Sequence, residues 1–224
     1  MPHHYDVKAA MQLYFIAGTQ DCLHLAGDPA QHLLNILQQA LQSGITCYQF
    51  REKGKKSLQD PTQIRELAMQ CRDLCRQYQV PFVVNDDVQL AIDIGADGIH
   101  VGQTDMAVAD VAALCHSHCF IGTSVNTLDQ GIAAQANPLI DYFGTGPIFP
   151  TQSKEDPKPV VGVDFVSTIR AHGIDKPIVA IGGVTAQTAA ELRRRGANGV
   201  AVISAITQSA DIAKTVKELL GNAQ

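Results

Sequence analysis

Short apolar runs alternate along this chain with longer segments in which apolar residues recur every three or four positions. The short runs are rich in Val, Ile and aromatic residues, which is typical of β-strands. Several of them, such as IVAI and VAVI, are continuously apolar, which favours parallel strands covered on both faces. The pattern predicts eight strands, at residues 12–17, 45–50, 81–84, 97–101, 119–121, 139–143, 177–181 and 199–203.

Each predicted strand is followed by a segment with helical spacing. Asp28-Pro29 opens the first helix, because an N-cap Asp followed by Pro is a common helix start, and Gly44 is placed to end it. Asp60-Pro61 opens the second helix in the same way. This second helix is predicted to run to Tyr78. The spacing predicts the remaining helices at 88–94, 108–115, 128–135, 163–172, 185–195 and 206–220.

Eight strand–helix repeats with no element left over predict a (β/α)₈ TIM barrel, with residues 1–224 as a single domain. The alternative is a doubly wound open sheet. That fold would usually carry a glycine-rich dinucleotide-binding turn after its first strand, and Ala17-Gly18-Thr19-Gln20-Asp21 is not one.

Composition and charge argue against some classes of binding partner. The chain has 224 residues, 46% of them hydrophobic, and a net charge of −5, which argues against a nucleic-acid surface. The first residues lack the apolar core of a secretory signal, and no stretch reaches the roughly 18 apolar residues of a membrane span. We therefore expect a cytoplasmic protein with no membrane partner, and leave a homo-oligomer open.

Cys115-His116-Ser117-His118-Cys119 places four potential metal ligands in five residues. Structural zinc sites more often pair Cys-x-x-Cys units from separated segments. The cluster also falls where a helix should end and a strand begin, so its ligands would diverge. We expect thiols without metal here, in a reducing compartment.

The most unusual stretch runs from Gly144 to Lys154 and on to Pro159, directly after the sixth predicted strand. Thr151, Ser153 and Lys154 offer two hydroxyls and an ammonium, which suit a phosphate or a pyrophosphate. An ordinary polar loop is the alternative. We also take residues 151–159 as a candidate lid over bound substrates, with Lys154 closing on a diphosphate.

In a barrel of this kind the site lies at the carboxyl ends of the strands, so polar residues there are candidates. Gln49, Arg51 and Lys53 follow the second strand and point the same way by alternation. Acidic residues at the next two strand ends, on the same rim, suggest a Mg²⁺–polyphosphate site. The alternatives are a solvated strand end and, for the pair Asp86-Asp87, a helix N-cap.

Later strand ends add small residues. Ser124 follows the fifth strand, Gly182-Gly183 the seventh and Ile203-Ser204 the eighth. Glycines there can bare backbone N–H groups to a phosphate, although glycine turns also occur for steric reasons. His100, after the fourth strand, is most simply a barrel-interior histidine, and we assign it no catalytic role.

Taken together, these motifs resemble the thiamine phosphate synthase (thiamine-phosphate pyrophosphorylase) family from Leu13 to Ile206. The resemblance is carried, in order along the chain, by residues 49–53 (QFREK), 85–86 (ND), 98–103 (GIHVGQ) with Asp105, 122–124 (GTS), 144–149 (GTGPIF), 151–154 (TQSK), 181–184 (IGGV) and 202–206 (VISAI). It implies an enzyme, a transferase that joins hydroxymethylpyrimidine diphosphate to thiazole phosphate and releases pyrophosphate by Mg²⁺-assisted dissociative substitution.

The resemblance also implies site residues. It implies that the diphosphate is held by Gln49, Arg51, Lys53, Asn85, Ser124 and Lys154, of which Arg51, Lys53, Ser124 and Lys154 are catalytic. It implies that Asp86 and Asp105 bind Mg²⁺. It further implies that the thiazole substrate is contacted by Thr151 and Ser153, and that its phosphate is held by Gly183, Ile203 and Ser204. Two positions depart from the family pattern: Ser153 replaces a Thr, and Asp87 adds a second acid beside Asp86.

Two other functions stay open at this point. A thiazole tautomerase-like barrel would have no use for the Arg51/Lys53 pair or a Mg²⁺ site, and this chain keeps both. A non-catalytic protein that binds thiazole phosphate would tolerate the loss of Asp86 and Asp105, which are present.

Overall fold

The fold is a closed barrel of eight parallel strands, which confirms the predicted TIM barrel. A computed structural model describes residues 5–115, 119–151, 153 and 158–221. Neighbouring strands pair in chain order, and β1 also pairs with β8, so that Leu13 lies opposite Val200. The strands are β1 (Leu13–Ala17), β2 (Cys47–Phe50), β3 (Phe82–Asn85), β4 (Gly98–Val101), β5 (Phe120–Val125), β6 (Tyr142–Thr145), β7 (Ile178–Ile181) and β8 (Gly199–Val202).

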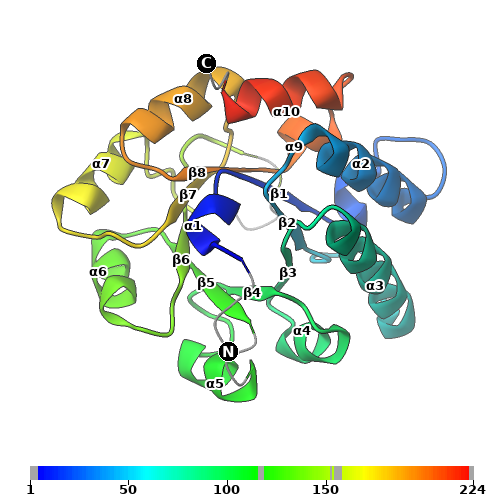
Figure 1. The fold of residues 1–224 in the computed structure, drawn as a ribbon, viewed down its shortest axis with the longest axis horizontal. Coiled ribbons are helices and arrows are strands. Elements are labelled where there is room, and N and C mark those ends of the chain that lie inside the picture. Colours follow the sequence, from blue (N-terminus) through cyan, green and yellow to red (C-terminus); the bar gives the residue numbers. More distant parts are fainter. Residues whose placement is uncertain (1–4, 116–118, 152, 154–157, 222–224) are drawn as a thin grey trace.

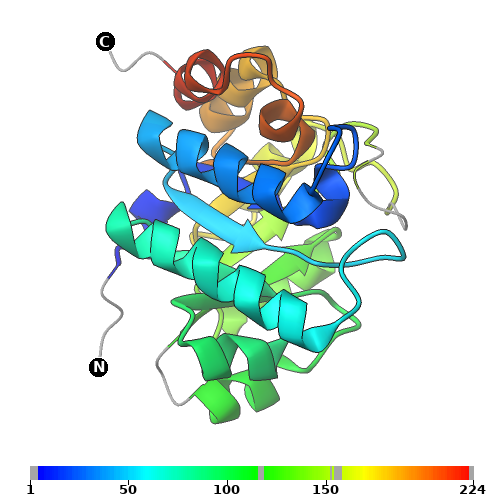
Figure 2. The same ribbon diagram turned by 90° about the vertical axis from the view of Figure 1, so that its right-hand side faces the viewer.

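The helices form a ring outside the strands (Figures 1 and 2). They are α2 (Pro29–Ser43), α3 (Pro61–Gln77), α4 (Val88–Ile94), α5 (Val108–Cys115), α6 (Leu128–Ala136), α7 (Asp164–Ala171), α8 (Ala186–Arg194) and α10 (Ile212–Leu220). Asp28 and Asp60 cap α2 and α3 as predicted, and Gly44 ends α2 in the left-handed conformation. Two short elements were not predicted, α1 (Val7–Ala10) and η1 (Thr19–Asp21), and a third, α9 (Ser204–Thr207), overlaps the start of the predicted last helix.

Two predicted strands are displaced in the structure. The sixth was expected at 139–143, but β6 begins at Tyr142, because the Asn137 side chain accepts the backbone N–H of Leu139 at 3.0 Å and holds a turn there. The fifth was expected to end at residue 121, but β5 continues to Val125. Gly122, Ser124 and Gly144 therefore lie within strands and not in the loops that follow them.

The predicted last helix, 206–220, is instead two helices. Residues 208–211 interrupt it, because Asp211 caps the start of α10 by accepting the backbone N–H of Lys214 at 2.9 Å. The preceding short helix, α9, begins at Ser204, directly after β8, and so belongs to the carboxyl end of the barrel.

Apolar side chains fill both the barrel and the layer between barrel and helices. The interior cluster includes Tyr14, Phe120 and Tyr142, together with Ala10 at the end of α1 and Met11 directly after it. Figure 1 shows α1 lying across one end of the barrel. Because these residues close the amino-terminal end, a ligand can enter from the carboxyl end.

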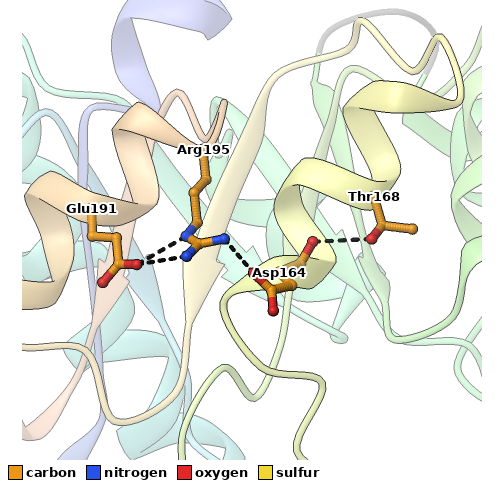
Figure 3. Close-up of polar contacts among 4 residues, drawn as sticks. All are labelled: Asp164, Thr168, Glu191 and Arg195. Carbon is orange, nitrogen blue, oxygen red and sulfur yellow. Dashed lines mark hydrogen bonds and ion pairs between the residues drawn. The ribbon is translucent and has the colours of Figure 1, made fainter.

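Polar contacts join neighbouring helices of the outer ring. Arg195, at the end of α8, donates to Glu191 through Nη2 at 2.8 Å and Nε at 3.0 Å, and it also donates to Asp164 at the start of α7 (Figure 3). The Thr168 hydroxyl donates to the Asp164 carbonyl oxygen at 3.0 Å. Within the described residues, no helix has both the length and the apolar character needed to cross a lipid bilayer.

Candidate active site

A cavity of about 1630 Å³ opens at the carboxyl ends of the strands. It brings together every predicted site residue that the structure describes. These are Gln49, Arg51, Lys53, Asn85, Asp86, Asp105, Ser124, Thr151, Ser153, Gly183, Ile203 and Ser204. Lys154, and most of the candidate lid around it, lie outside the described residues.

Two carboxylates and one ammonium meet on one side of this cavity. Lys53 Nζ lies 2.5 Å from Asp86 Oδ2 and 4.0 Å from Asp105 Oδ1. The Gly102 N–H donates to Asp105 Oδ2 at 2.7 Å, which fixes that carboxylate. Asp86 has a positive φ of 62°, so its backbone is held in an uncommon conformation as its side chain turns toward Lys53.

The two carboxyl groups interact directly. Burial raises the pKa of Asp86, and the hydrogen bond from Lys53 offsets this only in part. Burial also tends to raise the pKa of Asp105. The hydrogen bonds from the Gly102 N–H and with Asp86 outweigh this effect and hold the Asp105 pKa below its usual value. Two acids this close repel each other when both are ionised, and a cation between them relieves the repulsion.

These carboxylates suit Mg²⁺ as a partial ligand set. Mg²⁺ prefers hard oxygen ligands and is commonly held by one or two carboxylates together with phosphates and water. Among the described residues, no group of three or more His, Cys, Asp or Glu side chains is placed to hold a metal ion. A divalent ion here would therefore need ligand oxygens that a bound diphosphate can supply.

The neighbouring acid, Asp87, has a separate task. Its side chain accepts the backbone N–H of Leu90 at 2.9 Å and caps α4. The helix-cap interpretation of the pair Asp86-Asp87 thus holds for Asp87, while Asp86 faces the cavity.

Glu52, between Arg51 and Lys53, fastens two loops together. Its carboxylate accepts the Thr19 N–H at 2.5 Å, the Thr19 hydroxyl at 2.8 Å and the Leu58 N–H at 3.0 Å. The segment after β1 is thereby joined to the segment after β2. The cationic side chains on either side of Glu52 start from a backbone that this carboxylate holds in place.

Gln49 lies deeper than its cationic neighbours. It is 2% exposed, and its Nε2 donates to the Tyr14 hydroxyl at 2.9 Å. Both nitrogens of His100 are hydrogen-bonded, Nδ1 to the Tyr142 hydroxyl at 3.0 Å and Nε2 to Ser124 Oγ at 3.1 Å, as expected for a barrel-interior histidine. Gln49, His100 and Ser124 therefore form part of the cavity's inner wall.

The glycines after β7 have a packing role. Gly183 has a φ of 63°, and a Cβ there would lie 2.7 Å from Phe149 Cβ and 2.9 Å from the Pro150 carbonyl oxygen. A Cβ on Gly182 would lie 2.6 Å from Pro147 Cβ. The loop after β6 thus packs directly on the loop after β7, which is a steric reason for both glycines alongside phosphate binding.

The cluster 115–119 is described only at its two ends. Cys115 and Cys119 are buried free thiols, and Cys119 Sγ lies 3.3 Å from the Ala96 carbonyl oxygen. His116, Ser117 and His118 lie outside the described residues, so the expected absence of metal there stays a prediction.

The cavity is also lined by polar residues that were not among the predicted site residues. Gln20 and Asp21 follow β1, and the strand-end rule could have found them. Tyr14 sits in an apolar run that does not reveal which side chains face inward, and Lys158 lies near the end of the Gly144–Pro159 stretch. The cavity therefore has more polar groups than the motifs alone indicated.

Comparisons with known proteins identify the family of the chain. A family model described as "Thiamine monophosphate synthase" matches residues 13–206. A protein of Pasteurella multocida (strain Pm70) named "Thiamine-phosphate synthase" is 94% identical over 218 residues, covering 97% of this chain and 99% of the relative. A relative of the same name in Histophilus somni (strain 129Pt) is 65% identical, covering 98% of this chain and 100% of the relative.

Solved structures share the fold. A thiamine phosphate pyrophosphorylase from Pyrococcus furiosus superposes with a TM-score of 0.80 at 29% identity, covering 96% of each chain. A 3-hexulose-6-phosphate synthase superposes with a TM-score of 0.62 at 17% identity, over 94% of this chain and 98% of that one, and this likeness shows the fold alone.

Proposed function

The chain belongs to the thiamine monophosphate synthase family, and on this premise we propose that it is a transferase that joins hydroxymethylpyrimidine diphosphate to thiazole phosphate. The products are thiamine phosphate and pyrophosphate. The observation that carries the proposal is one cavity at the carboxyl ends of the strands that gathers the Arg51–Lys53 pair, the Asp86–Asp105 pair and several hydroxyls. The cytoplasmic location and the oligomeric state stay predictions.

The reaction needs no nucleophilic side chain. The bond between the pyrimidine methylene carbon and the diphosphate oxygen breaks, and its electron pair leaves with the diphosphate. The electron-rich aminopyrimidine ring stabilises the resulting cation. The thiazole nitrogen then supplies the electron pair of the new carbon–nitrogen bond. The protein's task is to stabilise departing charge and to hold two substrates in line.

We assign the departing charge to one side of the cavity. In this proposal Arg51 and Lys53 hold the diphosphate, and Asn85 and Ser124, which line the same cavity, add further contacts. Mg²⁺ bound by Asp86 and Asp105 would neutralise further charge on the same oxygens. Lys154 keeps its proposed contact with the diphosphate on sequence grounds alone.

We assign the thiazole substrate to the opposite side. Thr151 and Ser153 would contact it, and Gly183, Ile203 and Ser204 would hold its phosphate. Two anchors set the substrates face to face, and this converts a bimolecular reaction into one between oriented groups. Water must be excluded while the cation exists, because hydrolysis would yield the pyrimidine alcohol.

The test mixes the purified chain with both substrates and Mg²⁺. Thiamine phosphate and pyrophosphate are expected in equal amounts, measured by chromatography and by a coupled phosphate assay, with each substrate omitted in turn as a control. Conversion of the thiazole tautomer without the pyrimidine would favour a tautomerase. Tight binding of thiazole phosphate with no product would favour a binding protein.

A further inference from the structure

Five side chains form a continuous row of hydrogen bonds from the barrel interior to the cavity. Gln49 Nε2 lies 2.9 Å from the Tyr14 hydroxyl, which lies 2.8 Å from the Tyr142 hydroxyl. Tyr142 in turn lies 3.0 Å from His100 Nδ1, and His100 Nε2 lies 3.1 Å from Ser124 Oγ. We call these five residues the interior row.

We assign the hydrogens of the row in the direction that gives each hydroxyl one donor and one acceptor within it. The Gln49 amide nitrogen can only donate, so the Tyr14 oxygen accepts from it, and in this assignment Tyr14 donates to Tyr142. Tyr142 then donates to the ring nitrogen Nδ1 of His100. A neutral imidazole that accepts at Nδ1 carries its hydrogen on Nε2, which donates to Ser124.

Burial keeps the hydroxyl groups of Tyr14 and Tyr142 protonated, as this direction of hydrogen bonding requires. Tyr14 is 1% exposed and Tyr142 is fully buried, and burial raises the pKa of both well above the usual value. Both therefore keep their hydrogens across the physiological pH range.

Two glycines make room for the row. A Cβ on Gly122 would lie 2.1 Å from Tyr142 Cζ, and a Cβ on Gly144 would lie 3.2 Å from His100 Cε1. Each glycine is in a strand beside the ring it accommodates. The Gly122-Thr123-Ser124 and Gly144-Thr145-Gly146 motifs are thus partly explained by the rings that pack against them.

We propose that His100 is a positioning residue, held as its Nε2–H tautomer by Tyr142, so that Ser124 Oγ accepts from it and directs its own hydrogen into the cavity. A hydroxyl oriented in this way suits an anionic oxygen. That the acceptor is the departing diphosphate rests on the function proposed above. The orientation itself is a property of the protein without ligand.

The first experiment measures the tautomer in the ligand-free protein. Long-range nitrogen–proton correlation spectra distinguish a protonated from an unprotonated ring nitrogen. The chain has eight histidines, so a His100→Asn spectrum identifies which signals are lost. The expected result is a His100 ring with hydrogen on Nε2 and none on Nδ1. A ring protonated at Nδ1 alone, or at both nitrogens, at neutral pH would overturn the proposal.

The second experiment compares Tyr142→Phe with Tyr14→Phe. Each removes one buried hydroxyl, so the two should lose similar packing and stability, which makes Tyr14→Phe the matched control. Only Tyr142→Phe removes the donor to His100 Nδ1. We expect that variant to shift the ring toward the Nδ1–H tautomer and to lower turnover roughly three- to tenfold, with the KM for thiazole phosphate unchanged.

In Tyr14→Phe the tautomer should be unchanged, because Tyr142 still donates to His100, so any loss of turnover in that variant measures the effect on Gln49 and on packing. Equal losses of turnover in both variants, with the tautomer unchanged in both, would show a structural role only and overturn the proposal. The wild-type spectrum decides the matter even where a variant fails to fold. The same spectrum tests the tautomer even if the protein forms no thiamine phosphate, so a failure of the proposed function can be told apart from a failure of this proposal.

Discussion

At the residue scale, the adjacent acids Asp86 and Asp87 have different partners, and this difference can be measured. Asp86→Asn removes a charge from the cavity, so turnover should fall about a hundredfold or more, and more Mg²⁺ should be needed for half-maximal rate. Asp87→Asn is the control, because Asn caps a helix about as well as Asp, and it should stay within about twofold. Steady-state rates over a Mg²⁺ titration would measure both. The reverse ranking would assign the metal to Asp87.

Lys53 occupies the position between the carboxylates that a divalent ion would also favour. Metal that binds without diphosphate must displace this ammonium from Asp86, 2.5 Å away. Lys53→Met should therefore tighten the binding of Mn²⁺ alone roughly fivefold, equivalent to about 1 kcal/mol, while it weakens the handling of the diphosphate substrate. Titration followed by electron paramagnetic resonance measures free Mn²⁺ directly.

Lys55→Met is the control for Lys53→Met, since it removes the same charge from an exposed position two residues away. It should leave the Mn²⁺ affinity nearly unchanged. Weaker Mn²⁺ binding in Lys53→Met would mean that the two carboxylates do not form the metal site.

At the scale of elements, Glu52 joins the segments that follow β1 and β2. Burial raises the pKa of its carboxyl group, although the carboxylate accepts hydrogen bonds from Thr19 and Leu58 that lower it. A carboxyl whose pKa is higher in the folded than in the unfolded state stabilises the protein fully below the unfolded value. That contribution is lost as pH rises through the folded value. The stability of wild type relative to Glu52→Gln should therefore fall as pH rises above about 4, the usual range of a glutamate carboxyl.

Urea unfolding of both proteins at several pH values tests this, because other titrating groups cancel in the difference. A wild type that gains stability over the variant as pH rises would show that the Thr19 and Leu58 donors dominate over burial.

The contact between the loops after β6 and β7 can be separated from backbone strain with two glycines. Gly183 and Gly162 both have positive φ, of 63° and 80°, but only Gly183 has close neighbours, since a Cβ on Gly162 would meet nothing within 4 Å. Gly162→Ala should cost about 1–2 kcal/mol from backbone strain alone. Gly183→Ala should cost more and should also raise the KM for thiazole phosphate. Equal unfolding free energies would show that the loop yields without cost.

At the scale of the whole molecule, the ring of elements was predictable from the chain because helical spacing and short apolar runs follow one another eight times. The rim followed from it, since parallel strands bring their carboxyl ends to one side, and Arg51 and Asp105 could be placed in one site. Strand limits were less certain. Leu139 looked like part of an apolar strand but belongs to a turn, because the Asn137 side chain decides the local backbone.

Contacts between distant residues could not be derived in this way. The hydrogen bond between Tyr14 and Tyr142 joins the first strand to the sixth, and no local pattern signals it. Gly122 was expected to follow the fifth strand, whereas the structure has it inside β5, where it leaves room for an aromatic ring. Glycine in a sequence marks a position without a side chain, but the reason for it depends on what packs there.

The pairing of β1 with β8 determines when the barrel can close while the chain is being synthesised. These are the first and last strands of the chain, so the barrel cannot close until nearly the whole protein has left the ribosome. Until then β1 and the newest strand both present unpaired backbone groups, which can pair with another chain. A chain cut after residue 198 would keep both edges permanently. It should form aggregates that light scattering detects at concentrations where the full chain stays clear.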